Sequence, residues 1–325
     1  DTWGRSDIVP GSRYVSGRGA AMGDAAIPVV DDAAGALFYQ PAALAKLRGG
    51  INSEPLNLSF EGNTGYLGAY NLNFYKVTDL QAYKGTLITN MPDRLGVGAA
   101  LLPNFSMKGV AFGALAQTRL SSYYRDGWVT YRSKYEFVPT VGVGFNLAKG
   151  IIRLGYSGQW VNKVEASRTV EVRTTPNLSY RDRAYQGSGI SHNVGFALTW
   201  PFQYLPAINI VARNVAGTKY KSFGLLKLSS NSIGAPPEEK MSIDLAASIE
   251  PKIHGATYLN LVFQVRDFLN SSNYTFLGRA ALGAEFVINH FFFIRGGWGS
   301  GYGNAGFGIR TNHAEFSLAY YTEEM

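Results

Sequence analysis

Apolar and polar side chains alternate along most of the chain from about residue 51 onwards. The clearest stretch is 256–266, in which Leu259 and Phe263 fall on one face while Asn260 and Gln264 fall on the other. Successive side chains of a β-strand point to opposite sides of the sheet, so a repeat of two predicts a strand with one apolar face.

Thirteen stretches show this alternation, with turn residues between them. They are residues 51–60, 94–103, 108–122, 128–146, 151–169, 188–200, 206–219, 240–250, 256–268, 275–288, 291–298, 303–310 and 313–322. Many exceed the roughly 5–6 residues usual in globular sheets. The longest have the length expected of a strand that crosses a bilayer at a tilt and continues beyond it.

The composition favours a membrane barrel over a soluble β-protein. Only 16% of the 325 residues are charged, against about 25% in an average soluble domain. Yet no stretch approaches the ~20 uninterrupted apolar residues of a transmembrane helix. The 38 glycines suit a curved sheet, and the 20 tyrosines suit the two membrane–water interfaces. We therefore predict an all-β fold, a transmembrane antiparallel β-barrel whose apolar residues face lipid on alternate positions.

Residues 1–50 lack the alternation and are rich in glycine and alanine. Asp31 or Asp32 is expected to cap a short helix, because a carboxylate there accepts free backbone N–H groups. Pro41 predicts the start of a second helical turn. We therefore expect a small N-terminal plug, residues 1–50, inside a barrel formed by residues 51–325.

The connections between the predicted strands differ in length, and this difference predicts an orientation. Bacterial barrels keep short turns in the periplasm and long loops outside the cell. The expected periplasmic turns are 147–150, 201–205, 251–255, 289–290 and 311–312. The expected outer loops are 123–127, 171–187, 220–238, 269–274 and 299–302. The predicted location is the bacterial outer membrane, with the N-terminus in the periplasm.

The number of strands creates a difficulty at the end of the chain. In this orientation the stretch 313–322 would finish outside the cell, whereas a closed bacterial barrel has an even number of strands and returns to the periplasm. Either a further strand follows Met325, or one lies unrecognised within 61–93. A strand within 61–93 would not change where the chain finishes. We therefore expect about fourteen strands, with the last one absent from the given sequence.

Cysteine content and charge limit the chemistry. The absence of cysteine excludes a disulfide scaffold, a Cys-ligated metal and a thiol nucleophile. The net charge of +7 comes from dispersed basic residues with no run of five or six, so no nucleic-acid partner is expected. A positive lumen that favours anions stays open. The four histidines show no metal spacing, and neither a metal nor another cofactor is expected.

Two motifs with catalytic associations are better explained by structure. Ser191, His192 and Asn193 are the residue types of a barrel phospholipase, but neighbours on one strand alternate faces and cannot form a relay among themselves. The glycine-rich residues 297–303 are not followed by a helical pattern, which favours a hairpin over a phosphate loop. The chain is not expected to be an enzyme.

Charged residues of the predicted strands fall on the face opposite to the apolar one. The predicted inward set is Arg153, Asp244, Arg266, Arg279, Glu285, Arg295, Arg310 and Glu315. The predicted outward set is Ile208, Ile210, Leu245, Leu259, Phe263, Leu282, Phe286, Phe292, Ile294, Phe316 and Leu318. An Arg or Lys facing lipid near the midplane costs about 2–4 kcal/mol, which strongly disfavours the inverted assignment.

Two interpretations of the inward charges stay open. One is a charge network that fills the lumen and holds the plug. The other is a filter or a ligand-headgroup site, since an arginine fork binds a carboxylate at two points. The apolar loop pieces 223–226 and 268–269 are expected to capture a hydrophobic ligand, dock a partner or pack over the barrel mouth.

Residues 18–44 resemble the N-terminal signature of the FadL-type outer-membrane transporters and the related PorV-like barrels. That signature has a Met-Gly segment, an Asp-Asp pair, an aromatic pair and an Asn-Pro-Ala-Gly-Leu segment. The matching plug-motif residues are Met22, Gly23, Asp31, Asp32, Phe38, Tyr39, Gln40 and Pro41. Gln40 replaces the asparagine and Ala43 the glycine. Residues 282–286, 294–298 and 306–310 resemble closing strands of the same group.

The resemblance implies a fourteen-stranded barrel plugged by an N-terminal hatch. For the FadL type it implies passive passage of hydrophobic or amphiphilic small molecules, which leave the lumen sideways into the surrounding membrane lipids. For the PorV type it implies the alternative, a binding or scaffold barrel that partners another outer-membrane or secreted protein. A structural barrel with a sealed lumen is a third possibility.

Overall fold

The computed structural model describes residues 12–47, 49–63, 94–175, 179–269, 274–311 and 314–322. Its helices and 3-10 helices are short: α2 (Gly17–Ala21), η1 (Ile27–Val29), α3 (Ala33–Phe38), η2 (Pro41–Lys46), η4 (Ala148–Gly150) and α6 (Phe276–Arg279). None of the helices in these ranges has the length and apolar character needed to span a membrane.

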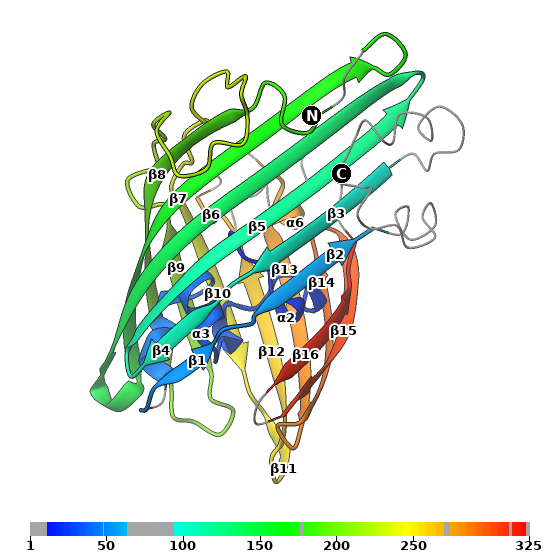
Figure 1. Ribbon diagram of the computed structural model, residues 1–325. Helices are drawn as coiled ribbons and strands as arrows, with labels where there is room; N and C mark the ends of the chain where they lie inside the picture. Colours follow the sequence, from blue (N-terminus) through cyan, green and yellow to red (C-terminus); the bar gives the residue numbers. More distant parts are fainter. Residues whose placement is uncertain are drawn as a thin grey trace.

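Sixteen strands in the described ranges form one sheet, and every ladder between them is antiparallel (Figure 1). They are β1 (Asn52–Glu54), β2 (Leu58–Gly62), β3 (Arg94–Leu101), β4 (Asn104–Met107), β5 (Val110–Arg125), β6 (Trp128–Leu147), β7 (Ile152–Glu171), β8 (Tyr185–Thr199), β9 (Ala207–Arg213), β10 (Ser242–Ile249), β11 (Lys252–His254), β12 (Thr257–Val265), β13 (Ala280–Ile288), β14 (Phe292–Gly299), β15 (Tyr302–Arg310) and β16 (Glu315–Tyr320). The predicted all-β, antiparallel fold is confirmed at this level.

The sixteen strands fill thirteen positions across the sheet, because three positions each hold two strands in line. β1 and β2 pair with β4 and β3, which both pair with β5, while β10 and β11 both pair with β12. A proline lies in each interruption: Pro55, Pro103 and Pro251. Proline has no N–H to donate to a ladder, which explains the breaks. These positions coincide with the thirteen predicted stretches.

The two edges of the sheet are β16 on one side and the β1/β2 position on the other. Thirteen antiparallel positions make these edges run in the same direction, and no ladder joins them within the described ranges. A side-chain contact links them instead: the Tyr321 hydroxyl donates to Glu61 at 2.7 Å. The further closing strand stays a prediction. Its alternative place, 61–93, is described only as far as residue 63.

The strands differ greatly in length on the two sides of the sheet. β5 to β8 hold 15 to 20 residues each, whereas β9 to β16 hold nine or fewer. Figure 1 shows the long strands rising together beyond the short ones at one end of the sheet. Residues 214–241, which connect β9 to β10, occupy the space beside the upper part of β8, where Lys221 pairs with Ser188.

The inner face of the sheet is the one that contacts residues 12–47, here called the N-terminal segment (Figure 1, blue). The outer face carries the apolar side chains predicted to point outward. Ile208, Phe263, Leu282 and Phe316, for example, are all between 43% and 60% exposed. One face is therefore apolar and free, and the other is covered by the chain's own N-terminal part.

The predicted helix start is confirmed, since α3 follows Asp32, whose carboxylate accepts from the N–H of Gly35. η2 begins at Pro41 as expected. α2 and η1 were not predicted, because glycine-rich and proline-containing turns carry no helical periodicity.

Two predicted strand ends are wrong. Residues 275–279 form α6 with its cap rather than the start of a strand, because the Thr275 hydroxyl accepts from the Gly278 N–H. Residues 214–219 do not continue β9, since Asn214 and Ala216 adopt positive φ angles that end the ladder. Local side-chain capping and left-handed backbone override the alternation at these places.

Candidate functional site

The N-terminal segment lies directly against glycines of the inner face. A Cβ atom built on Gly155 would lie 2.1 Å from the backbone of Pro41, and one on Gly297 would lie 2.2 Å from Met22. Similar close approaches occur at Gly113, Gly142, Gly144, Gly195, Gly283 and Gly306. These glycines therefore make room for the segment, a role beyond the sheet curvature for which the sequence favoured them.

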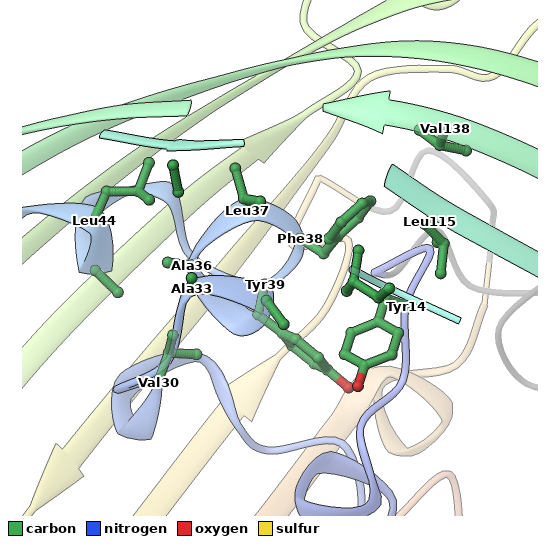
Figure 2. Close-up of a cluster of buried hydrophobic side chains, with 14 of the residues drawn as sticks. Tyr14, Val30, Ala33, Ala36, Leu37, Phe38, Tyr39, Leu44, Leu115 and Val138 are labelled. Atoms are coloured by element: carbon green, nitrogen blue, oxygen red, sulfur yellow. The ribbon is translucent and has the colours of Figure 1, made fainter. Parts of the chain in front are cut away.

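Apolar packing fixes the middle of the segment on the long strands. Leu37, Phe38 and Leu44 are fully buried, and they pack with Leu115 of β5 and Val138 of β6 (Figure 2). The segment is short, so its helices are stabilised by this burial rather than by their own length.

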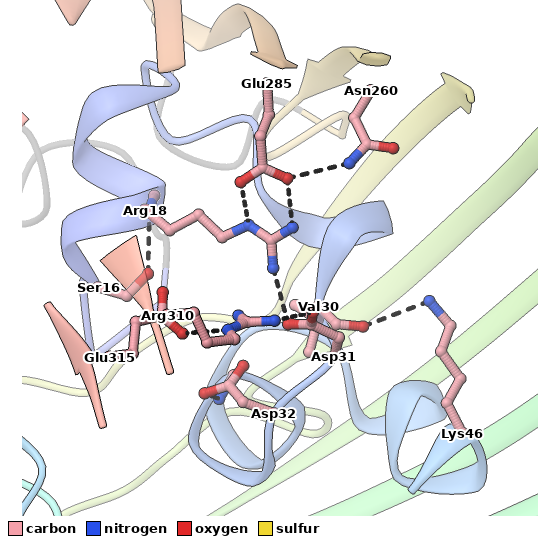
Figure 3. A network of polar contacts seen from close by, with 12 residues as sticks. Ser16, Arg18, Val30, Asp31, Asp32, Lys46, Asn260, Glu285, Arg310 and Glu315 are labelled. Carbon is pink, nitrogen blue, oxygen red and sulfur yellow. Dashed lines mark hydrogen bonds and ion pairs between the residues drawn. The ribbon is translucent and has the colours of Figure 1, made fainter. Parts of the chain in front are cut away.

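A network of charged side chains fixes the other end of the segment to the short strands (Figure 3). Its centre is Glu285 of β13. Arg18 of α2 donates to both carboxylate oxygens at 2.9 and 2.5 Å, and Arg295 of β14 donates at 2.7 Å. Asn260 adds a fourth hydrogen bond at 3.0 Å. The Glu285 and Arg295 side chains have no solvent exposure, so each charge depends on its partners.

Asp31 extends the network towards the end of the sheet. Its carboxylate accepts from Arg18 at 2.8 Å and from Arg310 of β15 at 2.9 Å (Figure 3). Arg310 also donates to Glu315 of β16 at 2.7 Å. Asp31 is 43% exposed, which makes it the accessible member of a row of alternating charges.

The two adjacent carboxyl groups, Asp31 and Asp32, are held in opposite states. Burial and then repulsion from Asp31 raise the pKa of Asp32 to about 6, although the Gly35 N–H opposes the shift. Burial acts to raise the pKa of Asp31 as well, but Arg18 and Arg310 outweigh it and lower that pKa well below its usual range. Asp31 is thus the charged anchor and Asp32 the helix cap that titrates near neutral pH.

A second anchor holds the C-terminal end of α3. Arg213 of β9 donates to the carbonyl oxygens of Phe38 and Tyr39 at 2.7 and 3.0 Å and pairs with Asp244 of β10 at 2.7 Å. A cation is favoured at this end of a helix, where carbonyl groups lack partners. Gln40 continues the contact by donating to Asn209 and to the Phe196 carbonyl, both at 3.1 Å.

Two further charged contacts complete the attachment. Arg266, which directly follows β12 and is 1% exposed, pairs with Asp24 at 3.2 Å. Arg13 pairs with Glu136 of β6 at 3.1 Å and with Glu239 of the β9–β10 connection. The segment is therefore tied to both the long and the short strands.

The segment also contacts both edges of the sheet from the inside. The Tyr14 hydroxyl hydrogen-bonds Asn57, in the β1/β2 interruption, at 3.0 Å. Gly17 of α2 lies against Ser317 of β16, where a Cβ atom would come within 3.0 Å. The N-terminal segment thus lies on the inner side of both edges, which no ladder joins in the described ranges.

The structure brings four of the eight predicted inward residues into one network: Glu285, Arg295, Arg310 and Glu315. Asp244 and Arg266 form separate pairs with Arg213 and Asp24. Arg153 stands apart and donates to Thr199.

The inward role of Arg279 stays a prediction, because this residue lies just outside a strand. This residue ends α6 and donates to the carbonyl oxygens of Asp267 and Phe268, because the strand begins only at residue 280. The plug-motif residues all lie in the segment. Met22 and Gly23 press on Gly297 and Trp298.

Sequence reasoning missed the partners that the segment supplies, such as Arg13 and Arg18, because no alternation marks residues in short helices and turns. Glu136 lies in the predicted stretch 128–146, so its alternation is a signal that would have found it. Within the described ranges, no group of three or more His, Asp or Glu side chains is arranged to hold a metal ion.

These features define a class of structure: an antiparallel sheet curled around a short N-terminal segment that charged and apolar contacts fix to its inner face. No family model and no curated protein matches the chain. Among solved structures, it is similar to the crystal structure of a Pseudomonas aeruginosa FadL homologue, with 10% sequence identity, 94% of this chain and 93% of that chain covered, and a TM-score of 0.30. At this score the likeness is coarse.

Proposed function

We propose that the chain is an outer-membrane β-barrel that allows passive passage of hydrophobic or amphiphilic small molecules, with the N-terminal segment as its plug. The observation that carries the proposal is the contrast between the two faces of the sheet. The outer face is apolar and exposed, as lipid requires. The inner face is occupied by a segment that is held by apolar packing in its middle and by ion pairs at Arg18, Asp24 and Asp31, and these ion pairs can exchange partners without loss of apolar burial.

Opening is proposed to begin at the Asp31 end of the plug. Asp31 is exposed, whereas Leu37 and Phe38 are buried against long strands. Release of Asp31 from Arg18 and Arg310 loosens the part of the plug that lies on the inner side of the two sheet edges, β16 and the β1/β2 position. A hydrophobic molecule in the lumen then has a sideways route to the lipid.

The test measures uptake of a hydrophobic probe by cells that lack the protein and by cells that carry variants. Deletion is expected to lower uptake, and Asp31→Asn is expected to raise the conductance of the purified barrel in planar bilayers because one anchor of the plug is lost. Asp126→Asn is the matched control, since Asp126 lies in an exposed turn. Unchanged uptake after deletion contradicts the proposal.

The second candidate is a PorV-like barrel that binds another outer-membrane or secreted protein. It is favoured by exposed apolar side chains around α6, where Phe268, Leu269, Phe276 and Leu277 are 54% to 62% exposed. Replacing these four residues with serine is expected to abolish co-purification of the partner from native membranes and to leave uptake unchanged. Loss of uptake with no change in associated proteins favours the first candidate.

A further inference from the structure

A groove of about 790 Å³ crosses the outer face of the sheet. It spans β9, β10, β12, β13 and β14, which are neighbours in the sheet (Figure 1). Its lining is almost wholly apolar: Ser248 is the one residue with a polar side chain apart from the two tryptophans. No charged residue lines it.

The register of the strands explains the shape of the groove. Trp298, Leu282, Phe263, Ala247 and Ile208 pair in turn across the five strands and form one outward row. The next outward row is Gly296, Ala284, Leu261 and Ile249. Small residues in these rows, namely Ala247, Ala284 and Gly296, make the floor, and the large side chains beside them make the walls.

The groove runs obliquely between two aromatic ends. Trp298 lies near the end of β14, while Trp200 lies beside the short turn that holds the exposed Phe202 and Tyr204. Tryptophan and tyrosine gather at membrane–water interfaces. Four strand spacings of about 4.8 Å give a row roughly 19 Å long, and because barrel strands tilt by about 35–45° the row is inclined to the membrane. The groove therefore rises by roughly 12 Å along the membrane normal, about half of an apolar band that is about 25 Å tall.

We propose that this groove binds an acyl chain of a membrane glycerophospholipid, an inference that rests on the proposed membrane location of the outer face. An apolar, uncharged groove matches a chain of methylene groups, and every buried methylene adds favourable burial. The Trp200 end adjoins a short turn predicted to be periplasmic, which places the lipid headgroup at the periplasmic interface.

The groove and the contact with the plug lie on opposite faces of the same two strands, β13 and β14. Gly283 and Gly297 pair directly and meet Met22 on the inner face, while their neighbours Ala284 and Gly296 pair directly on the outer face. A substitution at Ala284 therefore changes the groove and leaves the plug contacts in place. A substitution at Ala284 can therefore test the groove separately from the plug.

The test uses the full chain in vesicles of phosphatidylethanolamine and phosphatidylglycerol, with a photoreactive group in the acyl chain of a phosphatidylethanolamine probe. Crosslinks are expected on peptides of β12 to β14. Ala284→Leu and Ala247→Phe fill the floor and are expected to lower this labelling about tenfold, the change expected when roughly two methylene groups lose their contacts. The matched control is Ala114→Leu, on the outer face of β5 opposite in direction to Gly113, and it leaves the labelling unchanged.

Labelling spread evenly around the barrel, or labelling that survives both groove-filling variants, overturns the proposal. Labelling by a lipid A probe alone, entering from the Trp298 end, overturns the glycerophospholipid assignment. The result is independent of transport: groove labelling in a protein that supports no uptake removes only the proposed passage. A chain that does not float with the vesicles contradicts both proposals.

Discussion

Glu285 is the centre of the charged network that attaches the N-terminal segment to the short strands. It accepts from Arg18, Arg295 and Asn260 and has no solvent exposure. Removing the charge from such a cluster leaves two guanidinium groups short of a counter-charge in a buried place, a loss that typically costs about 3–5 kcal/mol.

We expect Glu285→Gln to lower the free energy of unfolding by about that amount, seen as a lower temperature for the loss of the heat-modifiable folded band in electrophoresis. Asn260→Ala is the control, because it removes one hydrogen bond and costs roughly 1 kcal/mol. Equal effects of the two variants would show that Glu285 does not hold the network together.

Asp32 gives a prediction about pH. An aspartate titrates at about 3.9 in an unfolded chain, whereas the pKa of Asp32 in the folded chain is about 6. The folded state binds the proton more tightly, so the contribution of Asp32 to stability falls as the pH rises from about 4 to 6.

Asparagine keeps the capping oxygen and carries no charge. We expect Asp32→Asn to be more stable than the natural chain by roughly 1 kcal/mol above pH 6, a value reduced by partial solvent screening of the carboxyl group. The difference should vanish near pH 4. Thermal unfolding at several pH values measures it, and a constant difference across this range would contradict the assignment of Asp32 as the titrating group.

The residues of the network divide clearly into those that the sequence predicts and those that it does not. Glu285, Arg295 and Arg310 follow the alternation of their strands, so their inward position is readable from the sequence. Arg18 lies in a five-residue helix with two glycines, and its partner Glu285 is 267 residues away. No local pattern encodes such a pair, because only the folded chain brings the two residues together.

At the scale of elements, the N-terminal segment fits closely against the inner face of the sheet because the glycines there carry no side chain. We expect Gly297→Ala to displace Met22 from its contact with β14, since the new methyl group would lie 2.2 Å from the Met22 backbone. Forced overpacking of this kind typically costs about 1–3 kcal/mol. Protease digestion of the folded protein measures the effect as faster cleavage of the N-terminal segment.

The neighbouring residue provides a matched control for this prediction. Gly296 points to the outer face, and a Cβ atom there has its nearest contact at 3.9 Å. Gly296→Ala should leave the N-terminal segment as resistant to protease as it is in the natural chain. Identical digestion rates for the two variants would mean that the N-terminal segment does not depend on its contact with Gly297.

The positions of the strands were predictable, but several of their ends were not. Alternation fixes a strand wherever one face is apolar, as in β12. It fails at Thr275, whose hydroxyl caps a helical turn, and at Asn214, whose backbone turns left-handed. Both signals concern one or two residues, which is too few to change a pattern that spans a whole stretch.

At the scale of the whole molecule, the long strands β5 to β8 and the short turns predict which end faces outward. An epitope inserted between Asp126 and Gly127, in the β5–β6 turn, should be labelled on intact cells. One inserted between Lys149 and Gly150, in the turn after β6, should be labelled only after permeabilisation. The reverse pattern would invert the proposed orientation.

The ion pairs between the N-terminal segment and strands β13 to β16 have a consequence for the order of folding. Arg310 and Asp31 are 279 residues apart, and Arg18 and Glu285 are 267 apart, so the N-terminal segment is synthesised well before the strands with which it pairs. Contacts of such separation are slow to form. We therefore expect the N-terminal segment to reach its final position only after β13 to β16 have paired in register, because its ion pairs need those strands in place.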